Sequence, residues 1–183
     1  MRALKLLQCK IALVSFMTLG LQSISHAVDS ASLEFANGNR TQMLRIGTQW
    51  IWNNQWWQSN HTHIGGYWDL SLAQWREKNY AGGADEHQNL LSIGITPVFR
   101  FQNDSKTGFY TELGIGLHLL SDSYNNNRRS LSGNLQFGDH IGIGFVFTNN
   151  LDISFKFQHF SNGGIKEPND GVNFVVLRVG QTF

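Results

Sequence analysis

The feature that most limits the folds open to this chain is a strict alternation of apolar and polar residues that returns many times. In the clearest example, residues 151–162 (LDISFKFQHFSN), the odd positions are apolar up to Phe157 and the even positions are polar up to Gln158. Successive side chains of a β-strand point to opposite faces, so this pattern predicts a strand with one apolar face. The apolar row then continues into His159 and Ser161, which need a hydrogen-bonding partner or a chemical role there.

Seven other stretches repeat this period of two, and none shows the 3.6-residue period of an amphipathic helix. We predict strands at about Ser30–Ala36, Leu44–Trp52, Ile64–Leu72, Leu91–Phe101, Phe109–Leu119, Leu131–Phe147, Leu151–Asn162 and Val175–Phe183. Two architectures suit eight such strands. The apolar rows face inward in a soluble barrel or sandwich and outward in a membrane barrel.

Three features favour the membrane barrel. The strands are long enough for a tilted crossing of the bilayer, and the polar rows consist of Gly, Ser, Asn, Gln, His and Glu. Connections also alternate in length, with short ones at 103–106 and 148–150 and longer ones at 76–87, 121–130 and 163–171. The connection at 53–60 is an exception, but its Trp56 and Trp57 suit an interfacial aromatic girdle. The predicted fold is all-β: an eight-stranded antiparallel transmembrane β-barrel of the bacterial outer membrane, with Phe183 ending its last strand.

Residues 1–27 have the pattern of a cleaved secretory signal peptide, which leaves residues 28–183 as the barrel. Basic residues precede an apolar run at 11–21, and the small residues Ser25 and Ala27 close it. The run is short for a membrane span. The single cysteine, Cys9, lies in this segment, so we expect no disulfide in the mature chain.

The net charge and the spacing of possible metal ligands indicate which ligands the mature chain is not expected to bind. Without the three basic residues of the first segment the chain has a small acidic surplus, which argues against nucleic acid as a ligand. No metal-motif spacing is present, so neither a metal nor another cofactor is expected. Several polar residues fall on the inward rows and are expected to form a network inside the barrel: Arg45, His63, Arg100, Glu112, His118 and His140.

The position of His159 and Ser161 suggests chemistry on a lipid. If both termini lie on the periplasmic side, the pair faces lipid at the outer end of the seventh strand. The lipid at that level of a Gram-negative outer membrane is lipopolysaccharide, whose lipid A carries ester-linked acyl chains. Residues two apart on a strand share a face, so His159 can take the Ser161 proton for attack on an acyl carbonyl. Alternatively, both residues only form hydrogen bonds at the membrane interface.

Two neighbouring features favour catalysis. Asn162, Gly163 and Gly164 follow directly and could donate hydrogen bonds to an oxyanion, although such residues are also ordinary at a strand end. Asp139 is the acid in the lipid-facing row of the sixth strand. A hairpin that pairs Phe147 with Leu151 places Asp139 opposite His159, where a carboxylate could orient the imidazole, whereas a one-residue shift would remove this contact.

These residues resemble the PagL family of outer-membrane lipid A 3-O-deacylases. The resemblance lies in HFSNGGIKEPNDG at 159–171, together with the first segment and the barrel that ends in Phe183. It implies Ser161 as nucleophile, His159 as base, and Asn162, the Gly164 backbone and nearby Asn169 as oxyanion donors. Where the family has a glutamate, this chain has Asn173. Either Asp139 supplies the acid, or Asn173 only orients His159 through a hydrogen bond, or activity is weak.

The resemblance also implies a function. We expect hydrolysis of the ester at the 3-position of lipid A, with the active site toward the outer leaflet, no cofactor, and lipopolysaccharide in the outer membrane as partner of a monomer or homodimer. A non-enzymatic small barrel with a structural or surface-binding role is the alternative, and it would have no use for His159 and Ser161. A phospholipid esterase is a third hypothesis, which the position in the outer leaflet opposes.

Overall fold

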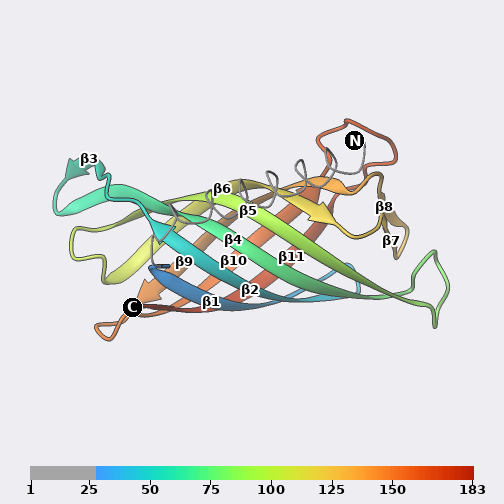
Figure 1. The fold of residues 1–183 in the computed structure, drawn as a ribbon, viewed down its shortest axis with the longest axis horizontal. Coiled ribbons are helices and arrows are strands. Elements are labelled where there is room, and N and C mark those ends of the chain that lie inside the picture. The colour runs from blue at the N-terminus through green and yellow to red at the C-terminus, as the bar shows by residue number, and fades with distance from the viewer. Residues whose placement is uncertain (1–27) are drawn as a thin grey trace, which may run out of the picture.

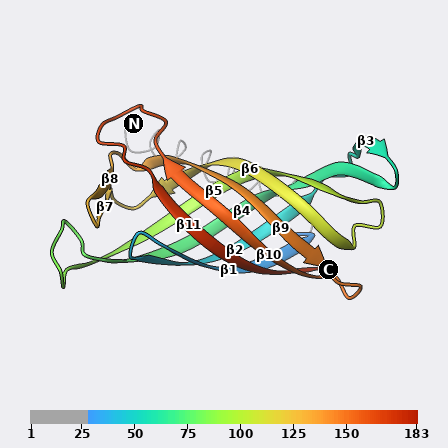
Figure 2. The same ribbon diagram turned by 180° about the vertical axis from the view of Figure 1, so that it is seen from behind.

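The computed structural model describes residues 28–183, which form a closed antiparallel barrel of eight long strands (Figures 1 and 2). These strands are β1 (Ser30–Gly38), β2 (Thr41–Ile51), β4 (Thr62–Lys78), β5 (His87–Asn103), β6 (Gly108–Leu120), β9 (Leu135–Val146), β10 (Leu151–Ser161) and β11 (Val172–Thr182). The barrel closes because β1 pairs with both β2 and β11. The expected signal peptide lies outside the described residues, and within 28–183 no helix has the length and apolarity needed to span a membrane.

The distribution of side chains is inverted relative to a soluble protein. On β6, the adjacent residues Glu112 and Leu113 are 2% and 57% exposed, respectively. Large apolar side chains are similarly exposed on all eight long strands, whereas the alternating polar residues are buried. The hydrocarbon core of a bilayer favours an apolar outer surface of this kind. Closure of the barrel also pairs the backbone groups of every long strand, so no unpaired strand edge faces the lipid. The protein is therefore an outer-membrane β-barrel, as predicted.

The lumen between the strands is filled by paired charges. Glu34 accepts hydrogen bonds from Arg45 and from Lys156 (Nζ to Oε1, 2.6 Å), and Arg100 donates to Asp152 (2.8 Å). Buried charges are tolerated only when they are paired and hydrogen-bonded in this way. All the polar residues expected inside are buried, namely Arg45, His63, Arg100, Glu112, His118 and His140.

An apolar cluster, here called the outer plug, closes the barrel at the end where β7 (Tyr124–Asn126) and β8 (Arg129–Leu131) lie. This end is opposite the C-terminus (Figures 1 and 2). The outer plug consists of Ala36, Met43, Ala73, Trp75, Leu90, Leu120, Tyr124, Leu131, Phe160, Val172, Phe174 and Val176. Trp75 is at its centre, with ring centroids 4.8 Å from Phe160 and 5.1 Å from Phe174, both edge to face. These contacts anchor the outer ends of β4, β10 and β11 to one another.

One predicted strand begins later than expected. The apolar row of the sixth strand was predicted from Leu131, but β9 starts at Leu135 and Leu131 belongs to the short hairpin of β7 and β8. Gly133 has a left-handed backbone (φ +79°), which breaks the extended chain between them. Leu131 consequently turns inward and is fully buried in the outer plug rather than facing lipid.

The connections follow the predicted lengths with one further exception. β1 and β2 are joined by a tight turn at Asn39 and Arg40, both with positive φ, although this turn lies on the side of the longer loops. At the opposite end, β3 (Trp56–Ser59) pairs with the first residues of β4, and this hairpin projects from the barrel (Figure 1). There Trp56 packs edge to face on Trp52, with ring centroids 5.8 Å apart.

Replacing Trp75 with alanine should destabilise the barrel by about 3–5 kcal/mol, the usual cost of deleting a buried aromatic side chain. The change removes the centre of the outer plug and the hydrogen bond from Nε1 to the Ser92 hydroxyl (2.9 Å). Urea unfolding of the reconstituted barrel measures the loss. Trp57→Ala is the control, because Trp57 is 82% exposed and a much smaller loss is expected. Equal losses would show that the outer plug contributes little to stability.

Candidate active site

The outer end of β10 presents His159 and Ser161 on the lipid-facing side of the barrel. Phe160 between them points inward and is fully buried against Trp75 and Phe174. Because neighbouring residues of a strand face opposite ways, this anchor directs His159 and Ser161 outward together. Both are partly exposed, and both lie where β10 leads into the loop at 162–171.

The imidazole of His159 is held by Asn173, its cross-strand neighbour on β11. Nδ1 of His159 lies 2.6 Å from Oδ1 of Asn173. An amide oxygen only accepts hydrogen bonds, so Nδ1 carries the proton and donates it, which leaves the lone pair of the neutral ring on Nε2. The structure therefore places Asn173, rather than Asp139, in hydrogen-bond contact with His159.

Asp139 lies on the other side of His159. The register of β9 and β10 pairs His159 with Asp139, and the Phe147 N–H donates to the Leu151 carbonyl (2.8 Å), so the predicted hairpin register is confirmed. Directly opposed residues in an antiparallel pair have Cβ atoms about 5 Å apart. Within residues 28–183, however, no hydrogen bond joins the Asp139 carboxylate to the imidazole. Asp139 is therefore a cross-strand neighbour of His159 and not its hydrogen-bond partner.

The loop after Ser161 uses most of its polar groups internally. Asn162 is 2% exposed, and its Nδ2 donates to the carbonyls of Ser132 (3.0 Å) and Lys166 (2.6 Å). Its Oδ1 accepts from the Gly164 N–H (2.9 Å), and its own N–H donates to Oδ1 of Asn169 (2.9 Å). No described residue accepts a hydrogen bond from Nδ2 of Asn169. Of the three predicted oxyanion donors, Asn169 thus has its side-chain donor free.

Gly171 is part of the site and was missed by sequence reasoning. Its backbone is left-handed (φ +67°), and a Cβ atom there would lie 2.5 Å from Cε1 of His159. The imidazole therefore packs directly on the Gly171 backbone. The sequence signal was only the Asp-Gly pair at the end of the 159–171 motif, which is equally typical of an ordinary turn.

Changing Gly171 to alanine should lower kcat by about tenfold or more, because the new methyl group must displace the ring that Asn173 holds. Esterase kinetics of the purified protein measure this. Gly133→Ala is a matched control, since Gly133 is also left-handed (φ +79°) but a Cβ there would meet nothing within 4 Å. If both variants lose activity equally, backbone strain alone explains the effect, and contact with His159 does not.

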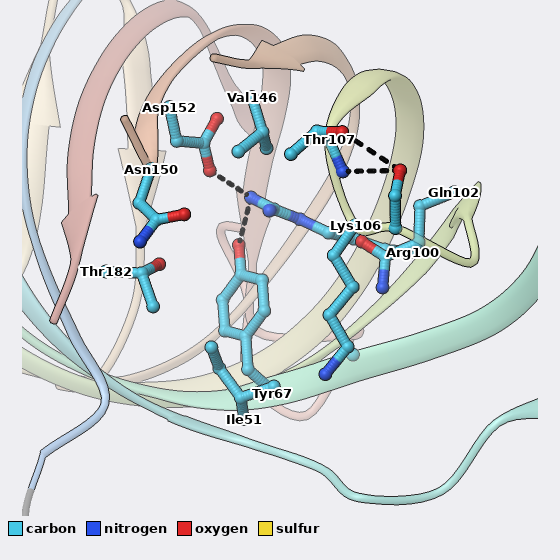
Figure 3. Close-up of a pocket in the computed structure, with 12 residues that line it drawn as sticks. Ile51, Tyr67, Arg100, Gln102, Lys106, Thr107, Val146, Asn150, Asp152 and Thr182 are labelled. Carbon is cyan, nitrogen blue, oxygen red and sulfur yellow. Dashed lines mark hydrogen bonds and ion pairs between the residues drawn. The ribbon is translucent and has the colours of Figure 1, made fainter. Parts of the chain in front are cut away.

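A separate polar cavity of about 200 Å³ lies at the opposite end of the barrel. Figure 3 shows Arg100 between Tyr67 and Asp152, where it donates to Asp152 Oδ2 (2.8 Å) and to the Tyr67 hydroxyl (3.4 Å). These groups satisfy one another and lie far along the strands from His159. Among residues 28–183, no group of three or more His, Cys, Asp or Glu side chains is arranged to hold a metal ion.

The fold and the site together define a small outer-membrane barrel that carries a serine–histidine pair on its lipid-facing surface.

Comparison with known proteins points to one family. The family model described as lipid A 3-O-deacylase (PagL) matches residues 42–182, and the chain belongs to this family. Two curated relatives are both named lipid A deacylase PagL. The one from Pseudomonas aeruginosa is 33% identical over 150 residues, covering 81% of this chain and 82% of that protein. The one from Bordetella bronchiseptica is 32% identical over 155 residues, covering 80% and 79%.

A solved structure agrees with this assignment, and a second shares the fold. A crystal structure of the outer membrane enzyme PagL superposes with a TM-score of 0.72 at 27% identity, covering 84% of this chain and 99% of that one. The N-terminal β-barrel domain of Pseudomonas aeruginosa OprF has a TM-score of 0.52 at 14% identity, covering 85% and 98%. That second likeness concerns the fold alone.

Proposed function

We propose that this protein is a lipid A 3-O-deacylase in which Ser161 is the nucleophile and His159 the general base. The observation that carries the proposal is the placement of both side chains on the lipid-facing surface at the outer end of β10, with His159 Nδ1 on Asn173. A purely structural barrel has no need of this arrangement. The names of the relatives point to lipid A as the substrate, and the family description points to the ester at its 3-position.

The reaction runs as two acyl transfers. Nε2 of His159 takes the proton of Ser161 while Oγ attacks the ester carbonyl, and the tetrahedral intermediate collapses by expelling the 3-oxygen of lipid A. The imidazolium gives its proton to that oxygen, which leaves as a hydroxyl. Water, deprotonated by His159, then attacks the acyl-serine, releasing a 3-hydroxy fatty acid and restoring Ser161.

The role of the triad acid is divided between two residues in this proposal. Asn173 fixes the tautomer and orientation of the ring, because its Oδ1 accepts from Nδ1 at 2.6 Å. An amide carries no charge to offset the imidazolium. Asp139, opposite His159 on β9, supplies the negative charge from the other side.

Oxyanion stabilisation falls to Asn169 and the backbone of Gly164. The free Nδ2 of Asn169 is the side-chain donor, and the Gly164 N–H turns to the oxyanion from its present acceptor, Asn162 Oδ1. Asn162 then acts by holding the loop in shape, since both hydrogens of its Nδ2 serve the Ser132 and Lys166 carbonyls.

Mass spectrometry of lipid A tests the proposal. Lipid A is isolated from Gram-negative cells that produce either the wild-type chain or Ser161→Ala, at equal levels in the outer membrane, and the two samples are compared. Loss of one 3-hydroxyacyl group with the wild type alone supports the deacylase and its nucleophile. Intact lipid A in both, with folded barrels, would refute the proposal and leave a structural barrel as the better account. Loss of phospholipid acyl chains instead would assign a different substrate.

A further inference from the structure

Two outer connections, the one between β6 and β9 and the one between β10 and β11, are joined by backbone hydrogen bonds beside the candidate active site. Residues 130–132, which comprise the end of β8 and the residue after it, pair with residues 168–170 of the β10–β11 loop. Ser130 N–H donates to Asp170 Oδ2 (2.7 Å), and Asp170 N–H donates to the Ser130 carbonyl (3.0 Å). A further bond joins the Ser132 N–H to the Pro168 carbonyl (2.9 Å), and Leu131 and Asn169 form a β-bridge. This pairing fixes the backbone of Asn169, the proposed oxyanion donor.

Arg129 completes this pairing at the end next to His159. Its Nη1 donates to two successive carbonyls, those of Asp170 (2.7 Å) and Gly171 (3.0 Å). Hydrogen bonds from a charged donor are stronger than neutral ones. Gly171 is the residue on which the imidazole of His159 packs. A direct path of contacts therefore runs from the Arg129 guanidinium through the Gly171 backbone to the general base.

The hydrogen bonds of Asn162 hold the loop from within, and the pairing with residues 130–132 adds support from outside it. Gly163 and Gly164 are both left-handed (φ +66° and +79°) and exposed, so the chain there has little side-chain packing. Displacements of about 1 Å at a catalytic group can cost about 10² in rate. The bonds from Arg129 and Asp170 tie the loop to a hairpin whose Tyr124 and Leu131 are buried in the outer plug.

We propose that Arg129 and Asp170 are positioning residues for catalysis, holding His159 through Gly171 and setting Asn169. This inference rests on the proposed function of the same site. It differs from a role for Arg129 as a contact for the lipid A phosphates, in which the guanidinium would bind the substrate rather than hold the backbone of the loop. A phosphate contact would govern substrate binding, whereas a positioning residue governs the chemical step.

The experiment compares Arg129→Met, Arg129→Lys and Asp170→Ala with the matched control Arg128→Met. Arg128 is the exposed neighbour in the same turn, and within residues 28–183 its side chain makes no hydrogen bond or ion pair. Each purified barrel is assayed for kcat and KM on lipid A and for the rate of Ser161 labelling by a fluorophosphonate. Folding is verified by the heat-dependent mobility shift in electrophoresis.

Arg129→Met and Asp170→Ala should each lower kcat and the labelling rate by about 10- to 100-fold with little change in KM. Arg129→Lys should restore most of both, since one Nζ can serve the two carbonyls that one nitrogen serves now. Arg128→Met should match the wild type. Unchanged kcat and labelling in folded Arg129→Met and Asp170→Ala, or a change in KM alone, would overturn the proposal.

The labelling assay separates this inference from the proposed function. If the wild-type chain is labelled at Ser161 but leaves lipid A intact, the substrate assignment fails, and the labelling rates of the variants still decide whether Arg129 and Asp170 position His159. A wild-type Ser161 that is not labelled at all would overturn both.

Discussion

Alanine at Ser161 is expected to lower the rate of ester hydrolysis by about 10³-fold or more, because the acyl-enzyme route then has no nucleophile. His159→Ala should cost nearly as much, since a serine hydroxyl without a base is a weak nucleophile at neutral pH. The double variant should be no slower than either single variant by more than a small factor. Residues that act as one unit show this non-additivity.

Initial rates on detergent-dispersed lipid A, together with the electrophoretic mobility of the folded barrel, provide the measurement. Both side chains face outward and are partly exposed, so neither substitution should perturb the outer plug. Independent, additive losses would mean that His159 and Ser161 do not work on the same proton. Substantial activity in folded Ser161→Ala would mean that the nucleophile is another residue.

The barrel was predictable because the alternation of apolar and polar residues determines which face of each strand every side chain occupies. A period of two places whole rows of side chains, and an inward row of Gly, Ser, Gln and His is compatible with a lumen but not with lipid. The contact between β9 and β10 followed from the same pattern. A short turn ending at Asn150, which has φ +64°, fixes the register that sets Asp139 opposite His159.

The outer connections were not predictable in this way. Leu131 was assigned to the sixth strand because it continues an apolar row, yet its side chain is buried in the outer plug. Its position depends on Gly133 and on pairing with Asn169, a residue far along the chain. Contacts of this kind between loops leave no periodic trace in the sequence. For the same reason, the sequence did not indicate that Gly171 packs on His159 or that Arg129 donates to the Asp170 and Gly171 carbonyls.

Asn173 is the residue of the site with the most informative substitutions. Asn173→Leu keeps a side chain of similar size but removes the acceptor for Nδ1 of His159. The ring then loses its orientation and its tautomer, and kcat should fall by about 10²–10⁴-fold, by analogy with loss of the tautomer-setting acid in a serine protease. Asn173→Glu keeps an acceptor and adds a charge, so kcat should rise, by about tenfold, through stabilisation of the imidazolium.

The dependence on Asp139 distinguishes the two hypotheses for the acid. If Asn173 orients and Asp139 supplies charge, Asp139→Asn should lower kcat about tenfold in the wild-type background and much less once Asn173 is glutamate. A cycle of kcat values for the four proteins measures this coupling, with Ser161→Ala as the inactive reference. If Asp139→Asn costs as much as Asn173→Leu, Asp139 is itself the triad acid and the Asn173 hydrogen bond is secondary. Full activity in Asp139→Asn would leave the imidazolium without any carboxylate, and Asn173 would then be the sole third member of the triad.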